Sequence, residues 1–235
     1  MICKSRPIFV EGRAIGRYNN YMTKNLYENK LDVEAFYDRI IKLYDVTFKF
    51  NRYSNSLERY LSDNLPALPQ APRILDAGCG PGLLTEALLK TSDSRSRITG
   101  IDLSAKSIHV AKKTVGEMGR FEGRVRFVQA NMLNMPFPDE SFDLVVTSGA
   151  IEYICLQAGL SEIARVLRPG GYLIYLPLRQ SLVGYFLAVS FQMKMYPPNE
   201  VTESVGSHFQ IISHHSFTPW EPIGWSKTAI LGRKL

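Results

Sequence analysis

One stretch of this chain constrains its fold more than any other, residues 74–82 with the sequence ILDAGCGPG. An apolar strand pattern ends in an acid, and three alternating glycines lead into a helical pattern at residues 83–90. A glycine turn between a strand and a helix lets the backbone approach a ligand, because glycine carries no Cβ. The helix N-terminus adds free N–H groups, which favour a carboxylate or a phosphate.

A second acid ends the next predicted strand. Residues 98–104, ITGIDLS, place Asp102 26 residues after Asp76, enough for one turn, one helix and one return strand. In nucleotide-binding sheets an acid at this strand end accepts hydrogen bonds from ribose hydroxyls. The glycine turn and Asp102 together predict a cofactor that contains adenosine.

The spacing of the glycines separates two classes of cofactor. A dinucleotide fingerprint G-x-G-x-x-G counted from Gly78 needs a third glycine where Leu83 stands. The pattern D-x-G-x-G-x-G instead resembles motif I of the class I S-adenosylmethionine-dependent methyltransferases. Residues 142–146, FDLVV, and 168–173, RPGGYL, resemble that family's fourth strand and the turn before its fifth. The resemblance covers residues 73–177 and implies S-adenosylmethionine as the cofactor.

The chain is expected to have two parts. Pro66, Pro69 and Pro72 mark a linker, because proline does not continue a helix, and they place the boundary near residue 72. Residues 32–63 have helical patterns, so we expect residues 1–72 to form an N-terminal helical lid or cap. Residues 73–235 are then the cofactor-binding domain.

Strand and helix patterns alternate after residue 72, which predicts an α/β, Rossmann-like sheet of mostly parallel strands. The last two strands have no helix between them, so the sheet is expected to end with an antiparallel strand. Strands are expected at 73–76, 98–102, 124–128, 142–147, 171–177, 209–217 and 226–233, and helices at 54–64, 82–91, 105–118, 157–167 and within 180–205.

The resemblance assigns a set of cofactor-binding residues that all lie at or just after expected strand ends. Asp76 would face the amine of the methionine portion, and Asp102 the ribose hydroxyls. Asn131 stands where the family usually has an acid that accepts from the adenine amino group. The assigned residues are Asp76, Gly78, Cys79, Gly80, Gly82, Asp102, Leu103, Asn131, Met132, Ser148 and Gly149.

Methyl transfer requires mainly that the methyl donor and the acceptor are aligned. A base is needed only where the acceptor holds a proton at pH 7, and the candidates are His214, His215, Glu152 and Tyr153. Tyr153 stands where many members of the family carry a histidine. His214 and His215 are neighbours on one strand and point to opposite faces, so at most one can face the site. Surface or packing roles for both histidines stay open.

Two regions are candidates for choosing the acceptor. Residues 178–205 are interpreted as a substrate-pocket insertion, since residues 182–191 are apolar on nearly all sides of a helix. Packing on the sheet explains the same pattern. In the N-terminal segment, Tyr-Asp pairs resemble those of small-molecule and quinone-biosynthesis methyltransferases. The candidate substrate-binding residues are Tyr37, Tyr44, Tyr185, Phe186 and Phe191.

The composition of the chain limits the kinds of partner and the cellular location that we expect. The net charge is +6, but no block of basic residues indicates a nucleic-acid surface. Cys3, Cys79 and Cys155 lack the spacing of a metal site and suggest a reducing compartment. The longest apolar stretch, residues 182–191, is shorter than the roughly 20 residues that span a bilayer. We therefore expect a cytoplasmic protein, a monomer or homodimer, with no metal and no nucleic acid, acting on a small, apolar or lipid-like acceptor.

Several alternatives stay open. The protein could methylate a quinone or a phospholipid headgroup at a membrane surface, which agrees with its basic charge, so peripheral membrane contact is one of the expectations. It could also bind the cofactor without catalysis, as a regulatory module. A nicotinamide oxidoreductase is disfavoured by the missing third glycine.

Overall fold

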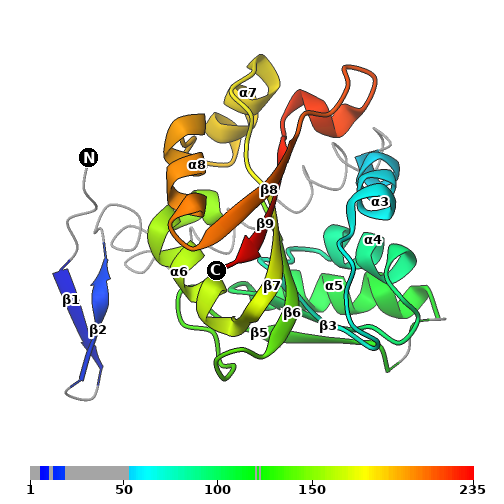
Figure 1. Cartoon of the computed structure of the whole chain (residues 1–235), viewed down its shortest axis with the longest axis horizontal. Coiled ribbons are helices and arrows are strands. Elements are labelled where there is room, and N and C mark those ends of the chain that lie inside the picture. The colour runs from blue at the N-terminus through cyan, green and yellow to red at the C-terminus, as the bar shows by residue number, and fades with distance from the viewer. Residues whose placement is uncertain (1–5, 11–12, 19–52, 120, 122) are drawn as a thin grey trace. The chain divides into compact units, whose positions relative to one another are not determined.

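A computed structural model describes residues 6–10, 13–18, 53–119, 121 and 123–235 of the chain (Figure 1). Contacts between these residues divide the chain into two compact units, residues 1–44 and residues 45–235.

The first unit contains a β-hairpin. Strand β1 (Arg6–Val10) pairs antiparallel with β2 (Arg13–Tyr18), and the register shifts between Pro7 and Ile8. No strand was expected here, because the sequence of these residues shows no clear periodicity.

The second unit is built on a sheet of seven described strands. They are β3 (Arg73–Ala77), β4 (Arg97–Asp102), β5 (Val125–Gln129), β6 (Phe142–Ser148), β7 (Leu167–Leu176), β8 (Phe209–His215) and β9 (Ala229–Lys234). The spatial order is β5-β4-β3-β6-β7-β9-β8. The pairs from β5 to β7 are parallel, and β9 runs antiparallel to both of its neighbours. The order of the strands reverses beside β3, and ligands bind at such a point in open α/β sheets.

Helices cover both faces of this sheet. In the described residues they are α3 (Tyr53–Asn64), α4 (Leu83–Thr91), α5 (Ala105–Glu117), α6 (Leu156–Val166), α7 (Leu182–Ser190) and α8 (Pro198–Gly206), with 3-10 turns η1 (Ile151–Tyr153) and η2 (Pro222–Trp225). Figure 1 shows α4 and α5 on one face and α6 and α8 on the other. Helix α3 packs on α4.

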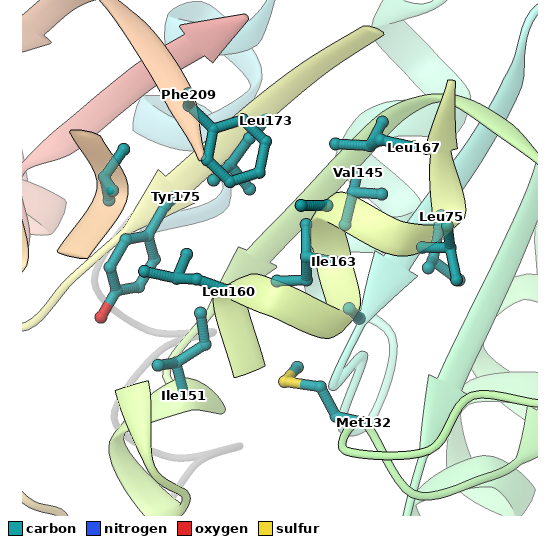
Figure 2. Packing of buried hydrophobic residues seen from close by; sticks show 14 of the residues in the cluster. Leu75, Met132, Val145, Ile151, Leu160, Ile163, Leu167, Leu173, Tyr175 and Phe209 are labelled. Atoms are coloured by element: carbon teal, nitrogen blue, oxygen red, sulfur yellow. The ribbon is translucent and has the colours of Figure 1, made fainter. Parts of the chain in front are cut away.

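The main hydrophobic core lies between the sheet and α6 (Figure 2). Leu160 and Ile163 of α6 meet Val145 of β6 and Tyr175 of β7, and all four side chains are fully buried. Strand β6 is buried along almost its whole length, as expected for a central parallel strand covered on both faces. The core therefore holds the carboxyl ends of β3 and β6 in fixed positions.

Local signals explain where the helices begin. The Ser104 side chain accepts a hydrogen bond from the Ser107 amide at 3.1 Å and caps α5. Helix α4 begins directly after Gly82, and α8 has proline in its first turn, where the missing N–H costs nothing. Helices α4 and α5 each start close after a parallel strand, so their N-termini lie at the carboxyl edge of the sheet.

The predicted fold class is confirmed, with local differences. The helix expected to end at residue 167 ends at Val166, and β7 begins at Leu167. Residues 168–171 are part of this strand, and the register of its pairing with β6 shifts there. Strand β8 ends at His215 rather than 217. The expected N-terminal helical cap is described only in α3, which lies in the same unit as the sheet. The boundary at residue 72 stays a prediction.

Candidate functional site

The glycine turn follows β3 at the carboxyl edge of the sheet. Gly78, Gly80 and Gly82 have φ values of 78°, 52° and 97°, in the left-handed region that favours glycine. The amides of Gly78 and Cys79 both donate to the Ile101 carbonyl oxygen of β4, at 2.9 and 2.8 Å. These two bonds tie the turn to the neighbouring strand.

The three glycines serve different purposes. A Cβ on Gly78 would lie 2.1 Å from the Cβ of Ala150, and a Cβ on Gly82 would lie 3.2 Å from that of Ala111. These two glycines therefore allow the turn to pack against the end of β6 and against α5. A Cβ on Gly80 would meet nothing within 4 Å. Gly80 is the position where a ligand can approach the backbone.

Asp76 is a fully buried carboxyl group with one oxygen unused. Its Oδ2 accepts a hydrogen bond from the Thr85 hydroxyl at 2.5 Å, while its Oδ1 is buried and has no hydrogen-bond partner. Burial raises the pKa of Asp76 to about 7, the Thr85 hydrogen bond opposes the shift, and the Asp102 charge adds to it. Such a group is stabilised by a nearby cation.

Asp102 joins the end of β4 to the glycine turn. Its Oδ2 accepts from the Gly80 amide and its Oδ1 from the Ser104 amide, both at 2.9 Å. Burial raises the pKa of Asp102, and these two hydrogen bonds lower it. Each carboxylate oxygen can accept a further bond, so the group can still bind hydroxyls. The next side chain, Leu103, is 52% exposed.

Asn131 and Met132 follow β5, and Met132 lies beside this turn. The Asn131 Oδ1 accepts from the Leu133 amide at 2.9 Å, and its side chain is exposed. Met132 is buried, and its Cε lies 3.4 Å from the position of a Cβ on Gly78. Figure 2 shows its thioether at the margin of the core.

The end of β6 leads into residues that the sequence analysis assigned to the methyl-donor end and to a base. Ser148 and Gly149 are half-buried, and Gly149 has a φ of 71°. Glu152 is buried, and its Oε1 accepts from the Leu178 amide at 2.9 Å. The Tyr153 hydroxyl donates to the Phe191 carbonyl oxygen at 3.0 Å, which ties η1 to the chain after α7.

The structure adds Lys227, a residue the sequence analysis missed. Its Nζ lies 3.8 Å from Glu152 Oε1 and 3.5 Å from the position of a Cβ on Gly149. No local pattern singles it out, because it stands alone in the segment that leads into β9.

The two histidines lie elsewhere. Strand β8 is the outer strand of the sheet, and β6, β7 and β9 separate it from the glycine turn. His214 is exposed, while the His215 ring packs at 5.0 Å from the Tyr60 ring and 4.7 Å from the Phe217 ring. The structure does not bring either imidazole to the carboxyl ends of β3 and β6.

The candidate acceptor-binding residues divide into three groups. Tyr185 and Phe186 of α7 are exposed, whereas Phe191, just after that helix, is buried. Tyr37 and Tyr44 lie outside the described residues.

Two further observations concern metal binding and thiol chemistry. In the described part of the chain, no group of three or more His, Cys, Asp or Glu side chains could hold a metal ion. Cys79 and Cys155 are free thiols, and burial strongly raises the pKa of Cys79, which argues against a nucleophilic role.

Comparison with known proteins agrees with this geometry. Residues 75–175 match a family model described as a methyltransferase domain. A fatty-acid O-methyltransferase of Mycolicibacterium smegmatis is 34% identical over 132 residues, which are 56% of this chain and 45% of that protein. A demethylmenaquinone methyltransferase of Staphylococcus aureus is 30% identical over 162 residues, 67% of this chain and 65% of that protein. The chain thus spans less than two thirds of the length of either relative.

Solved structures share the fold. The geranyl diphosphate C-methyltransferase of Streptomyces coelicolor, crystallised with Mg²⁺, geranyl diphosphate and S-adenosyl-L-homocysteine, has a TM-score of 0.63 to this chain. The two are 19% identical, and the match covers 77% of this chain and 79% of that one. At this identity the likeness is one of fold alone.

Proposed function

We propose that this chain, which carries a class I S-adenosylmethionine-dependent methyltransferase domain, transfers the methyl group of that cofactor to a small, lipid-like acceptor. The family resemblance predicted from the sequence is confirmed, since the family model covers residues 75–175 and the similar proteins named above are methyltransferases.

The buried oxygen of Asp76 that has no hydrogen-bond partner is the observation that most supports S-adenosylmethionine as the cofactor. The α-ammonium group of the methionine portion is a cation of the right kind to pair with it, which would compensate the cost of burying the carboxylate. In the turn that follows β3, a Cβ on Gly80 would meet nothing within 4 Å, so the backbone can approach the ligand there. When bound, the cofactor would supply a methyl group on a sulfonium, which the acceptor would attack in line while S-adenosylhomocysteine leaves with the electron pair of the broken carbon–sulfur bond.

The remaining cofactor residues suit a nucleoside. Asp102 would accept hydrogen bonds from the ribose hydroxyls, and the exposed Leu103 would cover the adenine. The Asn131 oxygen already accepts from Leu133, so an adenine amino group would share it, and Met132 would pack near the ring. Ser148 and Gly149 would line the methyl-donor end.

A lipid-like acceptor is supported by two observations. The relatives named above act on a fatty acid and on demethylmenaquinone, and both of these acceptors carry a long apolar chain. In this chain, α7 presents exposed apolar side chains to solvent, with Leu182 90% and Phe186 63% exposed. An apolar acceptor would gain from contact with such a surface.

The same surface supports acceptor capture from a membrane. No helix in the described residues is long and apolar enough to cross a bilayer. Trp220 is 91% exposed and lies two residues before η2, which α7 contacts. Tryptophan and apolar side chains on one surface suit the interface between lipid headgroups and acyl chains. The cytoplasmic location expected from the sequence stays a prediction.

Calorimetric titration with S-adenosylmethionine, S-adenosylhomocysteine and NADH tests the proposal. We expect binding of the first two and loss of affinity in Asp102→Ala. Turnover with a panel of phenols, quinones, fatty acids and lipid amines then separates an enzyme from a module that only binds the cofactor. Binding of NADH alone, or of none of the three, would contradict the methyltransferase function.

Sedimentation with vesicles that contain anionic phospholipid tests the membrane surface. Leu182→Ser combined with Phe186→Ser should reduce the bound fraction. Ile212→Ser is the matched control, because Ile212 is half exposed on the outer strand β8. Equal binding of the double variant and the wild type would contradict membrane capture through α7.

A further inference from the structure

A group of buried polar side chains lies beyond the glycine turn, at the carboxyl ends of β6 and β7. Its members are Glu152 of η1, Tyr175 of β7 and Lys227, which precedes β9, and they are 2%, 0% and 5% exposed. Each has a buried atom without a hydrogen-bond partner: Glu152 Oε2, the Tyr175 hydroxyl and Lys227 Nζ. Figure 2 shows the Tyr175 hydroxyl at the edge of the apolar core, on the side of Ile151.

The pair of charges in this group is incompletely compensated. Lys227 Nζ lies 3.8 Å from Glu152 Oε1, too far for a hydrogen bond, and Oε1 already accepts from the Leu178 amide. Burial lowers the pKa of Lys227, and the Glu152 charge opposes that shift. Burial also raises the pKa of Tyr175 well above its usual value, and the Glu152 charge adds to the effect. A buried ion pair is stable only when its remaining donors and acceptors are also satisfied.

The position of this pair links it to the cofactor turn. Lys227 Nζ lies 3.5 Å from the position of a Cβ on Gly149, and the next residue, Ala150, packs against Gly78. Met193 Cε lies 3.5 Å from the same Gly149 position. Because methionine side chains are flexible and adapt to their surroundings, Met193 can adjust to a ligand that binds next to Gly149. Lys227 and Met193 therefore both lie next to Gly149, whose neighbour Ala150 packs against the glycine turn.

We propose that Lys227 and Glu152 bind a hydroxyl group of the acceptor, with Lys227 donating to its oxygen and Glu152 Oε2 accepting its proton in a hydrogen bond. This inference rests on the proposed methyltransferase function and names the acceptor class, an apolar molecule with a phenol-type or other hydroxyl. One hydroxyl supplies both an acceptor and a donor, so it satisfies both unpaired atoms. A carboxylate would repel Glu152, and an ether or ester would leave Oε2 unsatisfied.

Equilibrium binding to the full chain loaded with S-adenosylhomocysteine tests this inference without turnover. The probes share one ring system: 1-naphthol, 1-methoxynaphthalene and 1-naphthoate. We expect the wild type to bind 1-naphthol about tenfold or more tightly than either of the others, since hydrogen bonds to charged groups are the stronger ones. Lys227→Met and Glu152→Gln should each abolish that preference and leave the affinity for S-adenosylhomocysteine within about twofold of wild type.

Lys194→Met is the matched control, because Lys194 is exposed in the nearby segment after α7 and should keep the preference. Equal binding of naphthol and its methyl ether by the wild type overturns the inference, and this measurement needs no variant to fold. A preference for naphthoate, or a hydroxyl preference that survives in Lys227→Met, overturns it as well. Failure of S-adenosylhomocysteine to bind would instead contradict the proposed function itself.

Discussion

The Asp102 carboxylate accepts a hydrogen bond from the Gly80 amide at 2.9 Å, which connects the end of β4 with the one glycine of the turn at which an added Cβ would meet nothing within 4 Å. The same side chain therefore orders the turn and is available to the ribose of a bound nucleoside. Asp102→Ala should weaken S-adenosylhomocysteine binding by about 10- to 100-fold, because charge-assisted hydrogen bonds contribute roughly 1.5–3 kcal/mol each. Calorimetry measures the change. Asp93→Ala, at an exposed acid paired with Arg95, should leave the affinity as it is, and an unchanged Kd in Asp102→Ala would refute the role.

Gly78 and Gly80 should respond differently to the same substitution. Gly78→Ala forces a Cβ to 2.1 Å from Ala150 at a φ of 78°, so we expect a large drop in the melting temperature of the ligand-free chain. Gly80→Ala meets no atom within 4 Å and should cost only about 1–2 kcal/mol for its left-handed backbone. It should nevertheless lose most of its affinity for S-adenosylhomocysteine. Thermal unfolding with and without ligand measures both effects, and tight binding by Gly80→Ala would argue against contact there.

The features that the sequence predicted well are those set by neighbours in the chain. The spacing of apolar residues and glycines predicts the strand, glycine turn and helix at residues 74–90. The length of one helix and one strand after that turn predicts that Asp102 ends the neighbouring strand. The antiparallel β9 followed from the absence of a helix before it. What spacing does not reveal is which glycine packs and which faces a ligand, because the Ala150 contact depends on the end of β6.

Lys227 illustrates the limit of local patterns. It meets Glu152 only because β9 lies between β7 and β8, which sets residues 177–178 beside residues 227–228. A single lysine in a loop has no period and no motif. The histidines on β8 illustrate the converse, since their residue type suggested chemistry and the strand order sets β6, β7 and β9 between β8 and the strand that leads into the glycine turn.

The pKa of Asp76 predicts how stability and binding depend on pH. An unfolded aspartate titrates near about 3.9, and burial raises the pKa of Asp76 to about 7 in the folded chain. Between these values the folded state binds more protons than the unfolded state, so stability of the ligand-free chain should fall as pH rises through this window. The ammonium group of a bound ligand favours the charged form of the Asp76 carboxyl group, so binding should release a proton. The affinity for the ligand should therefore rise as the pH rises from about 5.5 to about 7.5. Calorimetry in two buffers of different ionisation enthalpy counts the proton.

Asp76→Asn is the control for that titration. Its amide carries no charge, so the proton release and the rise in affinity with pH should both disappear. Affinity that stays constant across this pH range in the wild type, with no proton released, would show that Asp76 does not meet a cation.

Phe186 and Phe191 lie five residues apart in sequence but differ in what their truncation should do. Phe191 is 4% exposed, so Phe191→Ala should cost about 3–5 kcal/mol of unfolding free energy. Phe186 is largely exposed, so Phe186→Ala should change stability by no more than about 0.5 kcal/mol. If α7 receives the acceptor, Phe186→Ala should raise the acceptor KM and leave cofactor affinity unchanged. Chemical denaturation and steady-state kinetics measure the two effects, and an unchanged KM in Phe186→Ala would remove this side chain from the acceptor site.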